Sequence, residues 1–168
     1  MGALSRTFRR AILLPVLLSI TLFSTGLAQQ RALKVDELAK RAEVVAVGRV
    51  TELKSEWNQD QTMIFTRVTL AVDEYIKGGD RTTSLVTIKT LGGEVGEVGE
   101  MYTHAPSFRQ NERVVVFLQK DRLGEYRVSG GTQGKYNIEK DPVTGQMVVA
   151  GERRLEEFTE AVKQDLRK

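Results

Sequence analysis

The sequence contains no cysteine and only one histidine, His104, among its 168 residues. Without cysteine the chain cannot form disulfides and cannot bind a metal through thiolates. A lipid anchor of the acylated-cysteine type is excluded for the same reason. The fold must therefore be held together by its hydrophobic core alone.

Long hydrophobic runs are also scarce, and the longest lies near the start of the chain. The segment MGALSRTFRR carries three arginines and no acid, and the apolar run AILLPVLLSITLF and the small-residue stretch STGLA follow it. This three-part pattern is typical of a bacterial-type secretory signal peptide over residues 1–28, with cleavage after Ala28. Because the run is short and contains Pro15, we expect no stable membrane span after cleavage. We predict an exported protein, periplasmic or extracellular.

The predicted mature chain, residues 29–168, lacks net charge of either sign. Lys plus Arg falls from 25 to 22 without the three arginines of the leader, while all 22 acidic residues remain. A neutral exported chain offers no electrostatic support for nucleic-acid binding, so we predict no nucleic-acid partner. The residues available for the opposite hypothesis, base stacking and phosphate contacts on a barrel face, are Trp57, Phe65, Tyr75, Arg49, Arg67 and Lys89.

The residue pattern after the leader predicts one mainly β domain over residues 29–168 with a helix at each end. Apolar residues at helical spacing predict a short amphipathic helix over residues 35–42. A C-terminal amphipathic helix over residues 153–167 is predicted to pack against the sheet. Alternation with a period of two, together with turn signals, predicts six or seven strands. They lie within residues 43–57, 63–80, 84–91, 112–121, 125–131, 133–139 and 147–151.

The order of these elements favours a small closed antiparallel OB-like β-barrel. Two long strands, a third strand, a long loop and further strands are what such a barrel requires. Gly48 lies inside the first strand, where a bend or bulge would let the sheet curl. A β-sandwich is the alternative fold.

Four segments together resemble the exported bacterial relatives of the tissue-inhibitor-of-metalloproteinase and netrin-like OB-fold domains. The segments are AEVVAVGRVTEL, VTLAVDEYIKGG, LVTIKTLGG and PSFRQNERVVVFLQKD, and the resemblance covers about Asp36 to Ile138. It implies an OB-like barrel. The eukaryotic inhibitors chelate the protease zinc through an N-terminal cysteine, which this chain lacks, so the inhibitory mechanism is not carried over; Asn111 also replaces the glycine usual in the family. The residues that fill the pattern are Ala42, Val45, Gly48, Val50, Lys77, Gly78, Phe108, Glu112, Val115 and Leu118.

The segment Gly92–Phe108 is predicted to be an exposed loop and is the candidate recognition loop. Its glutamates would repel phosphate, and it lacks the spacing of a phosphate-binding glycine loop. Three carboxylates with one histidine are a poor ligand set for zinc, and the spacing of a calcium loop is absent. We therefore predict no metal and no cofactor. The candidate recognition residues are Glu94, Glu97, Glu100, Tyr102, His104 and Phe108.

No catalytic motif stands out in the chain. Ser107 has no nucleophile elbow around it, and none of the 22 acidic residues can be assigned to a catalytic pair. We predict a non-enzymatic binding module that recognises an extracytoplasmic protein or a cell-envelope ligand through its barrel loops. The alternatives are a metalloprotease-inhibitor-like protein without the cysteine mechanism, a small carboxylate-dependent hydrolase, and a structural component of the envelope.

Overall fold

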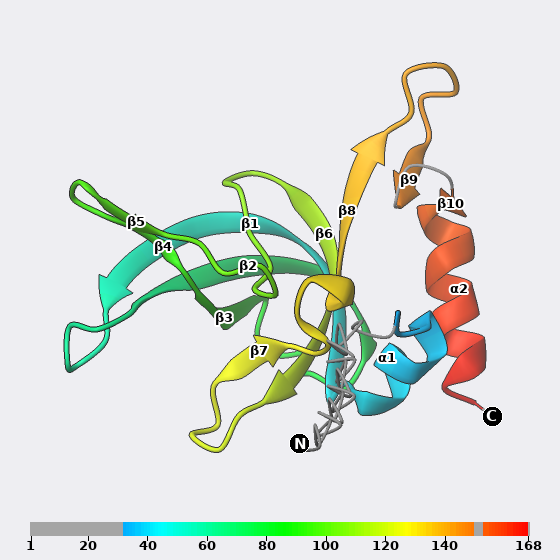
Figure 1. Cartoon of the computed structure of the whole chain (residues 1–168). Helices are drawn as coiled ribbons and strands as arrows, with labels where there is room; N and C mark the ends of the chain where they lie inside the picture. Colours follow the sequence, from blue (N-terminus) through cyan, green and yellow to red (C-terminus); the bar gives the residue numbers. More distant parts are fainter. Residues whose placement is uncertain (1–31, 150–152, 168) are drawn as a thin grey trace, which may run out of the picture. The chain divides into compact units, whose positions relative to one another are not determined.

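The computed structural model describes residues 32–149 and 153–167, so the predicted signal peptide lies outside the described residues. The described residues form ten strands, two α-helices and one 3-10 helix (Figure 1). In chain order they are α1 (Val35–Arg41), β1 (Val44–Trp57), β2 (Ile64–Lys77), β3 (Leu85–Leu91), β4 (Gly93–Val95), β5 (Val98–Glu100), β6 (Arg113–Lys120), β7 (Tyr126–Val128), η1 (Gly131–Gly134), β8 (Lys135–Lys140), β9 (Met147–Val149), β10 (Arg153–Arg154) and α2 (Leu155–Asp165).

Five strands close into a barrel. Their order is β1-β2-β3-β7-β6, and β6 pairs with β1 to complete the circle. This is the strand order of an OB-fold, so the predicted OB-like barrel is confirmed and the sandwich alternative is wrong. One contact departs from the antiparallel pairing of the other barrel strands. Strands β3 and β7 run parallel and meet at a single residue pair, Ile88 opposite Tyr126.

The barrel interior is filled by the inward-facing residues of its five strands. Along β2 the buried positions are Ile64, Thr66, Val68 and Leu70, as the alternation of the sequence predicted. Interior-facing and exterior-facing residues alternate along every barrel strand, which is why the pattern was readable. The apolar interior consists of Val44, Ala46, Val50, Val68, Leu70, Val86, Ile88, Val114, Val116, Leu118 and Val128.

A second core lies between the outside of the barrel and the two helices. Val45 and Phe117 point outward from β1 and β6 and pack with Leu38 of α1 and Phe158 of α2. The two helices lie side by side over this face (Figure 1). Because β1 and β6 are covered on both faces here, their sequences are continuous apolar runs rather than alternating ones. The predicted packing of the C-terminal helix is confirmed.

Three short strands were not predicted, and one of them changes a helix boundary. Arg153–Arg154 pair with Val148 and Val149 of β9, so α2 begins at Leu155 instead of residue 153. The other two strands, β4 and β5, lie inside the predicted loop. These segments read GEV, VGE and RR, and they lack the apolar and aromatic residues that marked the equally short β7 and β9 as strands.

The predicted bend in β1 is confirmed at Gly48. The β1–β2 register shifts between Val47 and Gly48. A Cβ atom at residue 48 would clash with the carbonyl oxygen of Ala71 on the neighbouring strand. Glycine therefore permits the close approach through which the sheet curls into a barrel.

Candidate functional site

The segment Gly92–Phe108 is not one open loop, because its first half is a β-hairpin. Gly93 pairs with Glu100, and Val95 pairs with Val98. Gly96 forms the turn with a φ of 62°, a conformation that glycine adopts without steric cost. The prediction of an exposed loop is therefore wrong for β4 and β5.

Glu100 fastens this hairpin to β2. Its Oε2 atom accepts hydrogen bonds from the backbone N–H of Ile64 at 2.9 Å and from the hydroxyl of Tyr102 at 3.0 Å. The carbonyl of Gly92, which lies opposite Ile64, accepts a hydrogen bond from the Thr66 hydroxyl at 2.7 Å and not from the N–H of Ile64. The carboxylate thus takes the place of a strand carbonyl at the end of the ladder. Glu100 was expected to lie on an exposed loop, but it is only partly exposed and is bonded to β2.

The same carboxylate alters the acidity of Tyr102. The hydrogen bond to Glu100 raises the pKa of Tyr102 above its ordinary value, and desolvation and the charge of Glu100 act in the same direction. Two of the predicted candidate residues, Glu100 and Tyr102, are therefore brought together, but as an anchor for the hairpin.

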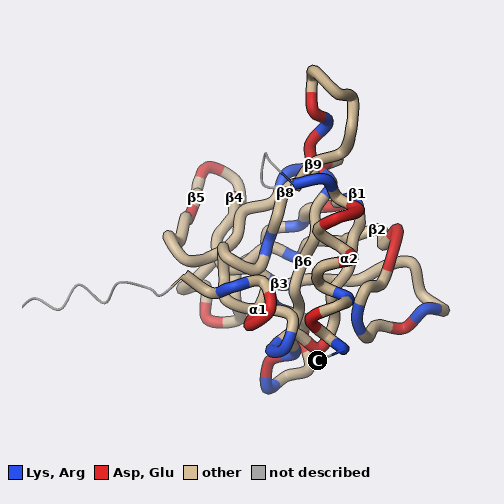
Figure 2. Tube along the Cα trace, turned by 90° about the vertical axis from the view of Figure 1, so that its right-hand side faces the viewer, with Lys and Arg blue, Asp and Glu red and all other residues tan. Residues whose placement is uncertain are grey.

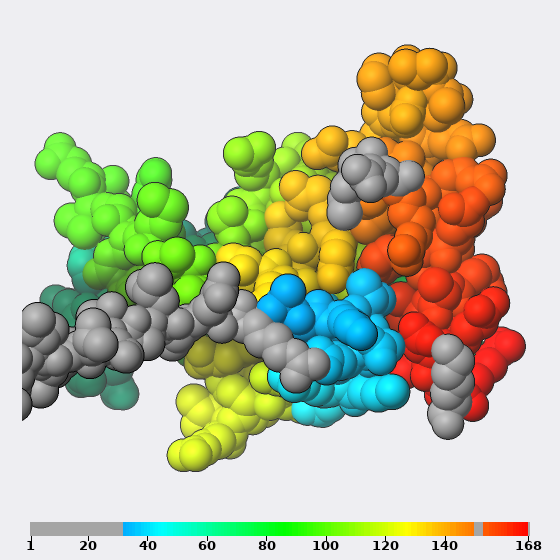
Figure 3. Space-filling view, turned by 45° about the vertical axis from the view of Figure 1, so that its right-hand side comes forward, coloured from blue at the N-terminus to red at the C-terminus, as the bar shows by residue number. Residues whose placement is uncertain are grey.

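Beyond the anchor, exposed side chains of two hairpins form what we call the double-hairpin surface. Glu94 and Glu97 are exposed on the β4–β5 hairpin, where Figure 2 shows acidic residues along the trace. Large apolar side chains accompany them, with Met101 95%, Val98 47% and Met63 41% exposed. Met63 precedes Ile64 in the chain, and Met101 follows Glu100. The hydrogen bond between Ile64 and Glu100 joins the β1–β2 hairpin to the β4–β5 hairpin. In Figure 3 the green β4–β5 segment projects from the barrel.

The last two candidate residues lie away from this surface, where the chain crosses the end of the barrel. Pro106 is buried, and its carbonyl accepts a hydrogen bond from the Thr90 hydroxyl at 3.0 Å. Phe108 packs against the barrel interior. His104 is exposed, and its carbonyl oxygen accepts a hydrogen bond from the N–H of Thr132 at 3.3 Å. The six predicted residues thus do not form one cluster.

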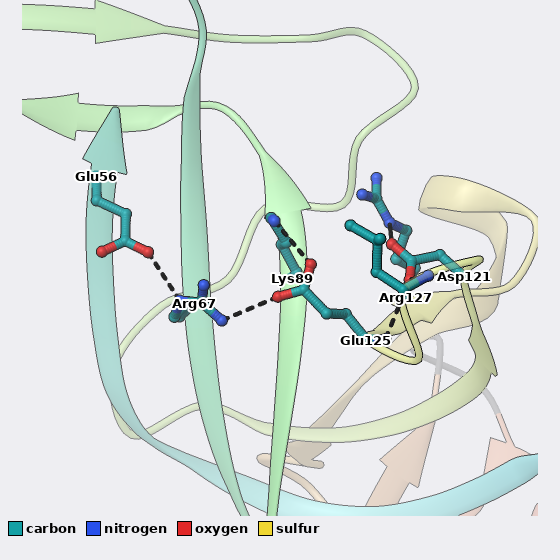
Figure 4. Close-up of polar contacts among 7 residues, drawn as sticks. Glu56, Arg67, Lys89, Asp121, Glu125 and Arg127 are labelled. Carbon is teal, nitrogen blue, oxygen red and sulfur yellow. Dashed lines mark hydrogen bonds and ion pairs between the residues drawn. The ribbon is translucent and has the colours of Figure 1, made fainter. Parts of the chain in front are cut away.

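A chain of ion pairs crosses the outer face of β1, β2 and β3 (Figure 4). Arg67 contacts Glu56 at 2.8 Å and Glu125 at 3.0 Å, and Lys89 contacts Glu125 at 2.7 Å. The Lys89 ammonium lies 4.1 Å from the ring centroid of Phe65. The hydrogen bond from Lys89 lowers the pKa of Glu125 below its ordinary value, against some desolvation and with further help from Arg67. The hydrogen bond to Glu56 raises the pKa of Arg67 above its ordinary value.

This network bears on the nucleic-acid alternative. Of the residues available for it, the structure brings Phe65, Arg67 and Lys89 together on one face. Arg67 and Lys89 are already paired with carboxylates, so a phosphate at this position would have to displace one of the carboxylates. The absence of a nucleic-acid partner stays a prediction.

Two further observations concern residues 32–149 and 153–167. Within them, no group of three or more His, Asp or Glu side chains is placed to hold a metal ion. None of the helices in this part of the chain has the length and apolar character needed to cross a membrane.

Sequence reasoning missed the apolar members of the double-hairpin surface. Met63, Val98 and Met101 stand beside glycine, glutamate and threonine, and nothing in their spacing indicates that they face solvent. The only available signal was their position in segments rich in turn residues.

No protein-family model matches the chain, and a search of curated proteins finds no match. The resemblance to the tissue-inhibitor-of-metalloproteinase and netrin-like domains therefore stays a prediction that rests on the sequence segments alone.

Proposed function

We propose that this protein is an exported, non-enzymatic binding module that recognises another extracytoplasmic protein through the double-hairpin surface. The observation that carries the proposal is the exposure of Met63, Val98 and Met101 on two hairpins joined by the Glu100 carboxylate. Export rests on the leader-like pattern of residues 1–28.

The chemistry of this surface suits protein recognition. Methionine is flexible and polarizable, so it packs against varied partner surfaces and is frequent at binding sites. Exposed apolar side chains that are grouped and bordered by charge often mark such sites. Glu94 and Glu97 supply that border, which favours a partner whose facing surface is apolar at its centre and basic at its edge.

Anchoring of the hairpin makes recognition more favourable. A Cβ atom at Gly93 would clash with the hydroxyls of Ser55 and Thr66, so the base of β4 lies tightly against β1 and β2. The Glu100 bonds hold the other strand of the hairpin. A surface that is ordered before binding loses less conformational entropy when its partner arrives.

The test uses the full chain expressed with its own N-terminal segment and a C-terminal affinity tag. N-terminal sequencing of the exported protein is expected to show cleavage after Ala28. Captures from the extracytoplasmic fraction then compare wild-type protein with a variant that combines Met63→Ser, Val98→Ser and Met101→Ser. We expect a partner that the wild-type protein retains and the triple variant loses.

A matched control removes exposed apolar side chains elsewhere. Leu123 and Val143 are 80% and 91% exposed and lie on other turns, so Leu123→Ser with Val143→Ser should retain the partner. All variants must first show the circular dichroism of the wild-type protein. Binding of the purified partner by the triple variant with unchanged affinity would disprove the double-hairpin surface as the site, and turnover of a substrate by the wild-type protein would disprove the non-enzymatic assignment.

A further inference from the structure

The seam between β3 and β7 is the weakest closure of the barrel. All seven residues of β3 pair with β2, but only Ile88 pairs with β7. Among the described residues, Leu85–Thr87 therefore have a strand neighbour on one side only.

The backbone groups of this half-strand face the seam in a predictable way. The N–H of Val72 donates to the carbonyl of Ser84 at 2.7 Å, so Ser84 directs its peptide groups toward β2. Successive residues of an antiparallel strand direct these groups to opposite sides. Leu85 therefore directs its N–H and carbonyl toward the seam, before the point where β7 begins to pair. Thr87 directs its N–H there as well, while its carbonyl faces Tyr126 of β7. A row of such groups at a sheet edge is a template for an added strand.

An apolar groove of ≈ 310 Å³ lies beside this edge. Its apolar lining comes from Val44, Tyr75, Leu85, Val86 and Tyr126. Leu85 is 57% exposed although it lies within a strand. Tyr75 is held in place because its hydroxyl donates to the carbonyl of Thr83 at 3.2 Å, and because a Cβ atom at residue 79 would clash with its ring. The groove is therefore a built feature with an ordered aromatic wall.

The four charged residues that line the groove, two cations and two carboxylates, sum to zero net charge. Lys89 and Arg67 are paired with Glu125. The carboxylate of Asp80 accepts hydrogen bonds from the N–H and the hydroxyl of Thr82, at 2.9 Å and 2.6 Å. A charged ligand would have to break one of these ion pairs or the Thr82 hydrogen bonds, so the occupant that complements the groove is uncharged.

We propose that the β3 edge and this groove bind an extended, uncharged segment of a partner protein. The segment adds as a strand beside Leu85–Thr87 and places an apolar side chain between Tyr75 and Tyr126. Main-chain hydrogen bonds then supply affinity, and the groove selects the side chain. The site shares no residue with the double-hairpin surface, so the two surfaces can be tested separately.

The probe is a peptide selected from a phage-displayed library of random dodecapeptides on protein purified from the full chain. We expect the enriched peptides to be uncharged, with apolar residues at alternate positions. On binding, amide hydrogen exchange should slow at Leu85 and Thr87. A copy of the peptide with N-methyl groups on alternate residues should bind at least about tenfold more weakly, because it cannot donate along the edge.

Two variants of opposite charge test the groove itself. Leu85→Lys and Leu85→Glu should each weaken peptide binding by at least about tenfold, whereas Val143→Lys and Val143→Glu on the distant β8–β9 turn should leave it unchanged. Leu85 is exposed, so both variants should retain the wild-type amide spectrum.

Four outcomes would overturn the proposal. They are no enriched peptide, full binding by the N-methylated peptide, unchanged exchange at Leu85 and Thr87, and a loss of binding for only one sign of charge at residue 85. Full binding by the N-methylated peptide would indicate a pocket for a small apolar group rather than a strand site, and a one-sided charge effect would indicate a charged ligand.

Discussion

The ammonium of Lys77, at the end of β2, lies 2.6 Å from the carbonyl oxygen of Ala42, the C-cap residue of α1. It also contacts the carbonyls of Ala39 at 2.8 Å and Lys40 at 3.3 Å. The last carbonyls of a helix have no partner within it and carry partial negative charge. A lysine from the barrel therefore satisfies the end of a seven-residue helix and binds it to the sheet.

The Lys77→Met variant should lose roughly 2 kcal/mol of unfolding free energy, because three helix-end carbonyls lose a charged donor. Urea unfolding followed by circular dichroism measures the change. The matched control is Lys54→Met, an exposed lysine of β1, which should change stability by less than about 0.5 kcal/mol. Equal effects of the two substitutions would show that the cap does not stabilise the domain.

The neighbouring Gly78 explains why the Lys-Gly pair at the end of β2 belongs together. Gly78 has a φ of 56°, and a Cβ atom there would clash with the carbonyl of Glu43. The glycine allows the chain to turn against the start of β1 while Lys77 reaches the helix. In the sequence this pair was identified only through a resemblance, and the structure gives it a physical role.

The Glu100→Ala variant should loosen the β4–β5 hairpin. It removes the acceptor for the buried N–H of Ile64, which should cost about 1–3 kcal/mol. Amide hydrogen exchange at Ile64 should become faster. Glu100→Gln is the control, because its amide oxygen can still accept from Ile64 and Tyr102, and it should retain most of the protection. If exchange at Ile64 is unchanged in the alanine variant, the carboxylate does not anchor the hairpin.

The inner face of β2 and the C-terminal helix could be predicted from the sequence because their apolar residues recur at strand or helix spacing. The alternation of Ile64, Thr66, Val68 and Leu70 predicted the inner face of β2, and the helical stripe predicted α2. The parallel contact of β3 with β7 depends on one residue pair from distant segments, Ile88 and Tyr126. No local period carries that information.

The site was harder to predict for the same reason. Glu100 looked like a loop glutamate because its partner, the N–H of Ile64, lies 36 residues earlier in the chain. Lys77 looked like a strand-end lysine, although its carbonyl partners lie 35 to 38 residues away. Side chains that satisfy distant backbone groups are chosen by the tertiary fold, which local composition does not encode.

Glu125 should make the free energy of unfolding depend on pH under acidic conditions. Its pKa is lowered in the folded protein, mainly by the hydrogen bond from Lys89, so its contribution is present above the unfolded value of about 4.3 and is lost as pH falls through the folded value. Lys89→Met should raise the pKa of Glu125 toward the ordinary value. The variant should then lose less stability on acidification below about pH 4 than the wild-type protein does.

Carboxyl chemical shifts and urea unfolding at several pH values test this prediction. The control is Lys140→Met, since Lys140 is exposed on β8 away from the network. It should leave both the Glu125 titration and the acid slope as in the wild-type protein. A Glu125 titration that does not move in Lys89→Met would show that Arg67, and not Lys89, dominates its environment.

Phe158 of α2 packs against the ring of Tyr136, whose pKa is raised. The two ring centroids lie 5.1 Å apart, and burial raises the pKa of Tyr136 above its ordinary value. Phe158→Ala should cost about 3–5 kcal/mol as a large buried ring is lost. It should also shift the Tyr136 titration down toward about 10, because solvent gains access to the phenol. Absorbance titration isolates this group in a background in which the other three tyrosines, Tyr75, Tyr102 and Tyr126, are replaced by phenylalanine. The ring of Phe65 contacts Arg67 and Lys89 instead of Tyr136, so Phe65→Ala should leave the Tyr136 titration in place. A Tyr136 titration unmoved by Phe158→Ala would show that the helix does not provide the burial.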